Sequence, residues 1–386
     1  MKNWLIWAIV AGLLAGSTPA RAADPFVIEA VFPLSGNGAF LGKAEQQTLT
    51  VMEALINRSG GINGQPVHFN VQDDASSPQV GVQLMTALTA KHVPFVFGSA
   101  LVAVCNAMFP VSKDLLMYCF STGYHPPDGS LSFSGPVSTV DQITAGIRYL
   151  SERGLKRIAI LTSNDATGTD ADHIIDSILA QPEFRSVTIA SHQHFGVTDV
   201  SVSAQISQIT ASGAQALVGW TTGNSLGTIL HGYQDAGLKL AFVGGSGNLS
   251  YAEMKAYANL MPSDCSFPGS PALDPRSLPA GPARRAAEDF QTAFLAAGQH
   301  PDISSGYGYD QIQMVINAFR KLGTNATAVQ VRNYIVSSHF VGINGTYDFA
   351  AHPGQGLGSN GVVMLHYNVT KDGFDAVSGL GGTFKR

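Results

Sequence analysis

Apolar runs and amphipathic segments alternate along most of this chain. Residues 26–32 are apolar apart from Glu29, and residues 67–72 alternate between apolar and polar side chains, so both are predicted as strands. Between them, residues 44–57 carry apolar side chains at helical spacing, and the same order continues to a strand at 115–120. Strands separated by helices of this length pair in parallel through right-handed crossovers, so the sequence predicts an α/β layered fold.

A second series of the same kind begins near residue 143 and continues to a strand at 240–243. After residue 265 prolines are frequent and the pattern becomes irregular. Helices are predicted again at 283–297, 310–321 and 329–336, and the last predicted strand is 361–367. Because helices and an isolated strand follow two complete series, we expect the chain to cross between two lobes more than once.

The first 22 residues have the pattern of a segment that directs export. Lys2 gives a positive start, residues 4–14 are an apolar run too short to span a bilayer, and residues 20–22 form a small-x-small cleavage site. We therefore expect residues 1–22 to be a secretory signal peptide. No later apolar run is long enough for a membrane span, so the mature protein is expected outside the cytoplasm.

The composition and charge of the chain argue against some classes of protein and partner. A chain of 386 residues suggests two domains, and its charged fraction of 13% with a net charge of −5 argues against disorder and against a nucleic-acid partner. Three cysteines in an exported chain allow one disulfide and one thiol, and the sequence leaves the pairing of Cys105, Cys119 and Cys265 open.

One pair of histidines has the spacing of metal ligands. His192 and His194 would face the same side of a strand, where both imidazoles could reach one ion. Such a pair is more typical of a solvated strand edge, and three cysteines exclude a structural zinc site. We therefore expect neither a metal nor a cofactor.

Six segments of the chain, in this order and spacing, resemble a known family. The match extends over nearly all of the expected mature chain, and its specific segments are PLSGNGAFLGKAEQQ (33–47), NRSGGINGQPVHFNVQDDASSP (57–78), FVFGSA (95–100), RIAILTSNDATG (157–168), DAGLKLAFVGGSG (235–247) and GYGYD (306–310). The resemblance is to the periplasmic solute-binding proteins of ABC importers, in the branch that binds leucine, isoleucine and valine.

This resemblance implies the type I periplasmic-binding-protein fold: two Rossmann-like lobes, each a three-layer αβα unit with a parallel-sheet core. It implies three crossovers, near residues 140–144, 265–270 and 353–359, and a ligand held between lobes that close by hinge motion. Lobe 1 is then 23–142 plus 268–355, and lobe 2 is 143–267 plus 356–386. It further implies a periplasmic protein that serves an inner-membrane ABC permease, and we expect a monomer without enzymatic activity.

The residues that hold the ligand in this branch are largely replaced. The branch has a serine where Val102 stands and a threonine where Gly123 stands, both bonding the ligand carboxylate. It has an acid where Ser246 stands, which pairs with the ligand ammonium. A buried ammonium without a carboxylate partner costs about 3–5 kcal/mol, so we expect leucine, isoleucine and valine to bind weakly.

The predicted ligand-binding residues lie in loops at the carboxyl ends of strands, where small polar ligands bind in open α/β sheets. They are rich in hydroxyls and aromatic rings: Phe40, Ser99, Val102, Ser121, Thr122, Tyr124, Thr167, Trp220, Thr222 and Ser246. Such a lining suits a flat apolar ligand with one or two oxygens, which favours a small organic acid, above all an aromatic acid. Of Tyr307 and Tyr309, only one is expected to reach the cleft.

Two other functions compete with solute transport. Residues 223–227 fit the G-x-S-x-G pattern between a strand and a helix, so Ser225 is a candidate esterase nucleophile, with Asp310 and His352 or His366 as partners. No HGGG-like oxyanion loop precedes it, and Ser225 also fits as a helix-start residue. A ligand-binding module for a membrane sensor has the same fold and is not separated by the sequence.

Overall fold

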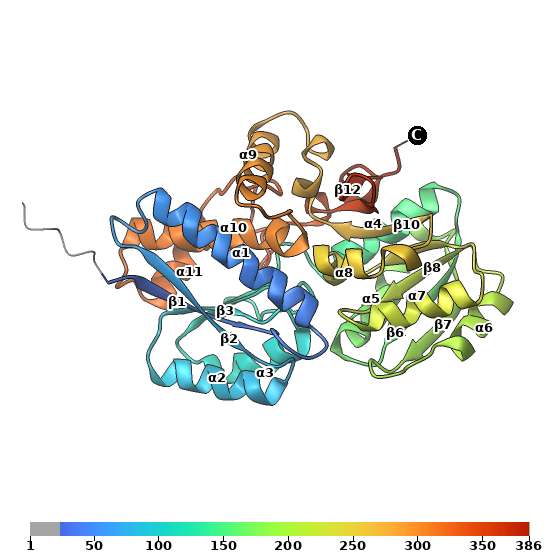
Figure 1. The fold of residues 1–386 in the computed structure, drawn as a ribbon, viewed down its shortest axis with the longest axis horizontal. Coiled ribbons are helices and arrows are strands. Elements are labelled where there is room, and N and C mark those ends of the chain that lie inside the picture. The colour runs from blue at the N-terminus through green and yellow to red at the C-terminus, as the bar shows by residue number, and fades with distance from the viewer. Residues whose placement is uncertain (1–23, 386) are drawn as a thin grey trace, which may run out of the picture.

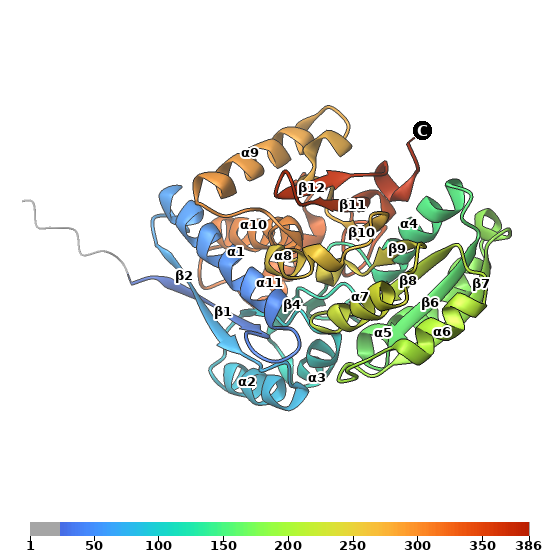
Figure 2. The same cartoon turned by 45° about the vertical axis from the view of Figure 1, so that its right-hand side comes forward.

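The computed structural model describes residues 24–385, so the predicted signal peptide lies outside the described residues. The chain forms two α/β lobes, each built around its own sheet (Figure 1). Elements from the start of the chain and the orange helices α10 and α11 form one lobe, and the green and yellow elements form the other (Figures 1 and 2). The predicted two-lobe α/β fold is confirmed.

The sheet of the first lobe has five strands in the order β2-β1-β3-β4-β5, and all of its pairs are parallel. Its strands are β1 (Phe26–Phe32), β2 (Val67–Asp73), β3 (Phe95–Gly98), β4 (Leu116–Cys119) and β5 (Ser132–Phe133). Its helices are α1 (Ala39–Arg58), α2 (Pro78–Ala90), α3 (Val102–Ser112), α10 (Ile303–Leu322) and α11 (Ala328–Ser337). Phe319 of α10 packs on Phe26 and Phe95 of the sheet, with ring centroids 4.9 and 6.5 Å away, so a late segment completes this core.

The sheet of the second lobe has seven strands in the order β12-β11-β10-β9-β8-β6-β7. They are β6 (Arg157–Ser163), β7 (Thr188–Phe195), β8 (Ala216–Trp220), β9 (Ala241–Gly244), β10 (Cys265–Gly269), β11 (Val363–Asn368) and β12 (Gly373–Ala376). Its helices are α4 (Thr139–Glu152), α5 (Ala166–Leu179), α6 (Ser203–Ala211), α7 (Ser225–Asp235) and α8 (Tyr251–Ala256). The remaining helix, α9 (Pro282–Ala296), packs on the short helical turns that follow β10.

The chain passes between the sheets three times. The first passage lies between β5 and α4, the second between β10 and α10, and the third between α11 and β11. Each lobe therefore combines segments that are far apart in the sequence. Loops of both lobes border the space between them.

The structure corrects the sequence prediction at β10, where proline content suggested irregular chain. β10 pairs in parallel with β9 through Cys265 and Ser266, and antiparallel with β11 through Phe267–Gly269. Pro268 lacks an N–H, so it lowered the predicted strand tendency. The strand tolerates Pro268 because its hydrogen bonding changes from one neighbour to the other at this point.

Two helices begin earlier than the pattern predicts. α1 begins at Ala39 rather than 44, and α10 begins at Ile303 rather than 310. Asp302 caps α10 by accepting hydrogen bonds from the amides of Ser304 and Ser305, and the Ser305 hydroxyl lies 2.8 Å from the Asp302 amide. This capping box outweighs the low helix propensity of the glycines that follow.

The cysteine pairing that the sequence leaves open is resolved. Cys105 of α3 and Cys119 at the end of β4 form a disulfide, and Cys265 is a buried thiol. Within residues 24–385, no helix combines the length and apolar character that a membrane span needs.

Candidate ligand-binding site

The two lobes meet around a cavity that is partly open to solvent. Ala100, Ser121 and Tyr307 contribute to its wall from the first lobe, and Trp220 and Ser246 contribute from the second. These residues follow the carboxyl ends of strands or lie in the first turns of helices. This is the position in which open α/β sheets place their ligands.

Four helices begin at the cavity wall, and the wall includes Val102 of α3, Thr139 of α4, Thr167 of α5 and Ile303 of α10. Side-chain caps fix three of these starts: Ser138 for α4, Asp165 for α5 and Asp302 for α10. The free amides of a helix N-terminus carry partial positive charge, so these starts favour a negatively charged group in the cavity.

Seven of the ten predicted site residues line this cavity: Val102, Ser121, Thr122, Thr167, Trp220, Thr222 and Ser246. Tyr307 also lines it, whereas Tyr309 packs against Phe290 and Phe294 with ring centroids 5.2 and 6.5 Å away. The structure therefore brings together most of the loops that the strand ends indicated.

Phe40, Ser99 and Tyr124 lie outside the wall. The ring of Phe40 packs against Tyr257 with ring centroids 6.3 Å apart, and the next residue on α1, Leu41, lines the cavity instead. The Ser99 hydroxyl donates to Asp74 over 2.6 Å and is buried. Tyr124 is buried and accepts a hydrogen bond from a serine hydroxyl. Each of the three side chains therefore has a structural partner of its own.

Two acids that the sequence argument overlooked line the cavity, Glu45 and Asp170. The position that carries an acid in the related branch is Ser246 here, and Asp165 is taken up as the cap of α5, where it accepts from the Gly168 amide over 3.1 Å. The premise that an ammonium would find no carboxylate in this cavity is therefore wrong. Helical spacing could have indicated both acids. Glu45 lies one turn after Leu41 on α1, and Asp170 lies one turn after the start of α5.

Asp170 occupies the space that a larger residue at position 123 would fill. A Cβ on Gly123 would lie 3.0 Å from Asp170 Oδ2, 3.2 Å from Thr139 Oγ1 and 2.8 Å from a methyl group of Val102. The glycine and the carboxylate are thus complementary, and a threonine at position 123 would collide with Asp170 unless one of them moved. Position-by-position comparison of the sequence does not reveal this exchange, because the two residues lie in different lobes.

His125 pairs with Asp170 from the opposite lobe. The distance between His125 Nε2 and Asp170 Oδ1 is 2.7 Å. The hydrogen bond to Asp170 raises the pKa of His125 above its ordinary value, although burial opposes this shift. The other carboxylate oxygen, Asp170 Oδ2, is buried and has no hydrogen-bond partner among the described protein atoms.

Glu45 is almost completely buried, and its surroundings favour the neutral acid. Burial raises the pKa of Glu45 well above its usual range, and the nearby carboxylates of Asp74 and Asp302 raise it further. A protonated Glu45 can both donate and accept a hydrogen bond, and it adds no negative charge to the cavity.

The cavity wall contains an unusual share of unpaired polar atoms. Six buried side-chain atoms of the wall have no hydrogen-bond partner within residues 24–385: Glu45 Oε2, Asp170 Oδ2, Thr221 Oγ1, Ser304 Oγ, the Tyr307 hydroxyl and Gln311 Oε1. A buried polar group without a partner costs about 1–3 kcal/mol, so these atoms favour a ligand that supplies hydrogen bonds.

The arrangement around Ser225 does not support the esterase alternative. Ser225 begins α7, is buried, and donates its hydroxyl to the carbonyl of Thr222 over 3.4 Å. Asp310 accepts from the amides of Ile343 and Asn344 elsewhere in the first lobe. In the part of the chain that the structure describes, no histidine bonds to Ser225.

Comparison with known proteins places the chain in a family. Residues 28–371 match the periplasmic binding protein family. The Leu-, Ile-, Val-, Thr- and Ala-binding protein of Pseudomonas aeruginosa is 24% identical over 325 residues, which cover 79% of this chain and 80% of that protein.

Solved structures show the same fold. The isoleucine complex of LivJ, a branched-chain amino acid transporter substrate-binding protein from Streptococcus pneumoniae, superimposes with a TM-score of 0.76 at 20% identity and covers 92% of this chain and 98% of LivJ. A solute-binding protein from Rhodopseudomonas palustris in complex with benzoate has a TM-score of 0.76 at 16% identity, covering 92% and 96% of the two chains. The chain belongs to the periplasmic binding protein family and has the two-lobe fold of its type I members.

Proposed function

We propose that this protein is the solute-binding component of an ABC importer and that its solute is a small amino-acid-like zwitterion. The observation that carries the proposal is the buried Asp170 Oδ2, which has no hydrogen-bond partner among the described protein atoms. Among the described residues, neither lysine nor arginine lines the cavity, whereas two carboxyl groups do.

An ammonium group on the ligand fits the Asp170 side of the cavity. Asp170 Oδ2 is buried and unpartnered, and Thr139 Oγ1 faces the same small space beside Gly123. A carboxylate and a hydroxyl oxygen together accept hydrogen bonds from an ammonium, and the negative charge offsets its desolvation. The protonated Glu45 offers a further acceptor without a second charge.

A carboxylate on the ligand fits the helix starts in the same cavity. The starts of α3, α4 and α5 contribute Val102, Thr139 and Thr167 to its wall, together with the hydroxyl residues Ser121 and Thr122. Backbone amides and hydroxyls bind a carboxylate without a formal positive charge. The apolar part of the ligand then meets Val102, Trp220 and Ile303.

An aromatic acid is the second candidate, because Trp220 and Tyr307 offer rings to the cavity and the R. palustris neighbour holds benzoate. Its single carboxylate would be held by amides alone, and its lack of a donor would leave Asp170 Oδ2 buried without a partner. This desolvation cost makes the zwitterion the better fit.

The relatives support the same role. The P. aeruginosa relative binds leucine, isoleucine, valine, threonine and alanine, and LivJ binds isoleucine. By this analogy the chain acts in the periplasm as a monomer, closes its lobes on the ligand, delivers it to an inner-membrane permease and carries out no chemical reaction on it.

Calorimetric titration of the untagged protein, unfolded and refolded to remove any carried ligand, tests the proposal. We expect one molecule of leucine, isoleucine, valine, threonine or alanine to bind per chain, more tightly than benzoate. Tight benzoate binding without amino-acid binding would favour the aromatic-acid alternative. Hydrolysis of p-nitrophenyl esters that is lost in Ser225→Ala would contradict the binding role altogether.

A further inference from the structure

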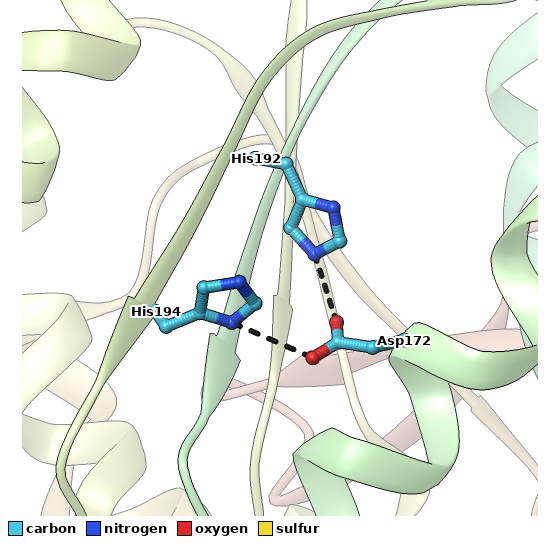
Figure 3. A group of neighbouring side chains, drawn as sticks. All are labelled: Asp172, His192 and His194. Carbon is cyan, nitrogen blue, oxygen red and sulfur yellow. Dashed lines mark hydrogen bonds and ion pairs between the residues drawn. The ribbon is translucent and has the colours of Figure 1, made fainter.

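A cluster of three metal-ligating side chains lies on the second lobe, outside the ligand cavity (Figure 3). His192 and His194 extend from β7, which is the edge strand of the seven-stranded sheet, and Asp172 reaches them from α5. The sequence shows the two histidines, but only the fold adds the carboxylate. Two imidazoles and one carboxylate are a frequent ligand set for divalent transition metals.

The three groups converge on one point. His192 Nε2 lies 2.8 Å from Asp172 Oδ1, and His194 Nδ1 lies 3.4 Å from Asp172 Oδ2. The ligand atoms of all three residues lie within 4.8 Å of one another. Ligand atoms around a tetrahedral zinc ion stand roughly 3.3 Å apart, given bonds of about 2.0–2.1 Å.

Backbone and buried neighbours hold the cluster in place. The pairing of β6 with β7 shifts by one residue between Ile189 and Ser191, so that β7 bulges just before His192. The buried hydroxyl of Thr162 lies 3.0 Å from Asp172 Oδ1 and 2.9 Å from His194 Nδ1. A hydroxyl that donates to a ligating carboxylate fixes its orientation, as the outer partners of metal ligands do.

We propose that Asp172, His192 and His194 bind a divalent transition metal of the zinc class. Neutral imidazole nitrogens suit Zn²⁺, Ni²⁺ and Cu²⁺ better than Mg²⁺ or Ca²⁺, which prefer oxygen ligands. The metal takes the place of the hydrogen that lies between His192 Nε2 and Asp172 Oδ1. The side chains are 24–48% exposed, so water completes the coordination from the solvent side.

Binding of the metal would link α5 to the edge strand. Asp172 lies two residues after Asp170, so the ion would fix the part of α5 that faces the ligand cavity. This proposal does not depend on which solute the cavity holds. The competing explanation is that the histidines serve only as hydrogen-bond partners of Asp172 and Thr162, and it predicts no metal binding.

Titration of the untagged, EDTA-treated protein with ZnCl₂ tests the site. We expect saturable binding of one Zn²⁺ per chain and a higher Tm in its presence. His192→Ala, His194→Ala and Asp172→Asn should each weaken binding at least about tenfold, because each removes one of three ligands. His173→Ala, which removes an exposed histidine next to Asp172 on the same helix, should bind zinc as the wild type does.

Thermal unfolding without metal checks that each variant is folded. Absence of saturable zinc binding in the wild type would overturn the proposal. Unchanged zinc affinity in the two folded histidine variants would overturn it as well, and so would loss of binding in His173→Ala alone.

Discussion

His125 and Asp170 join the two lobes across the ligand cavity, with 2.7 Å between Nε2 and Oδ1. His125 follows β4 in the first lobe, and Asp170 belongs to α5 in the second. On the other side of the cavity, the Asn37 side-chain amide donates to the carbonyl of Thr222 over 3.1 Å. Both contacts exist only when the lobes are close together, so they stabilise the closed arrangement in which a ligand is surrounded.

The His125 contact makes ligand affinity depend on pH. Pairing with Asp170 raises the pKa of His125 above 6.5, so the stabilisation is complete below about pH 6.5 and is lost as the pH rises through the raised pKa. Affinity should fall roughly two- to fivefold between about pH 6 and pH 8.5, since the pair is partly exposed. Calorimetric titrations across this range are expected to show the fall in the wild type and a flat profile in His125→Gln. A fall of equal size in His125→Gln would show that another group is responsible.

Substitution of Gly223 should prevent lobe closure. Gly223 has φ +77°, and a Cβ there would lie 2.1 Å from the carbonyl oxygen of Asn37 in the other lobe. We expect Gly223→Ala to lower ligand affinity at least about tenfold, while the strained φ costs roughly 1–2 kcal/mol of stability. The matched control is Gly237→Ala, with φ +63° and open space around the Cβ, which carries the strain without the collision. Equal affinities of the two variants would argue against closure at this contact.

Glu45 should make the protein less stable at higher pH. Burial raises its pKa, so the folded state keeps a proton that the unfolded state releases, and stability falls as the pH rises above about 4.5. Glu45→Gln keeps the neutral shape and should have a higher Tm than the wild type at pH 8, with a smaller difference at pH 5. Exposed Glu288 supplies the control, because Glu288→Gln should leave this pH dependence unchanged. Parallel Tm curves for wild type and Glu45→Gln would mean that Glu45 is charged in the fold.

The disulfide between Cys105 and Cys119 supports two loops of the cavity, because it ties α3 to β4. A bond that closes a loop of about 15 residues stabilises a fold by about 3 kcal/mol. The double variant Cys105→Ala/Cys119→Ala should lose about this much in urea unfolding. Dithiothreitol should destabilise the wild type to a similar degree and leave the double variant unaffected. A wild type that is insensitive to the reductant while unfolding would contradict the role of the bond.

The fold was largely predictable from local patterns, and its exceptions have local causes. Strand β1, apart from Glu29, and the central strands of the second lobe follow from apolar runs, which are typical of strands buried on both faces. β10 was missed because Pro268 weakens its strand pattern, and α10 began early because the Asp302 cap overrides its glycines. The β10 exception becomes visible only when its two neighbouring strands are known, whereas the cap of α10 by Asp302 and Ser305 is a signal within the local sequence.

The site was predictable to the extent that it follows strand ends. Ser121, Trp220 and Ser246 were found because each directly follows or ends a strand, as ligand loops do. Glu45 and Asp170 were missed because they lie within helices, and because their contact with the cavity depends on how the two lobes face each other. The small Gly123 leaves room for Asp170 because the two residues are neighbours in space. Their positions in the sequence do not show this.

The central claim is that Asp170 receives the ammonium of an amino-acid ligand. Its most direct test is calorimetric titration of Asp170→Asn with whichever of leucine, isoleucine, valine, threonine or alanine binds the wild type most tightly, with Asp176→Asn, an exposed acid on the same helix, as the control. Removing one partner of a buried ion pair costs about 3–5 kcal/mol, so affinity should fall at least roughly 100-fold in Asp170→Asn and stay unchanged in Asp176→Asn. Wild-type affinity in a folded Asp170→Asn variant would contradict the account.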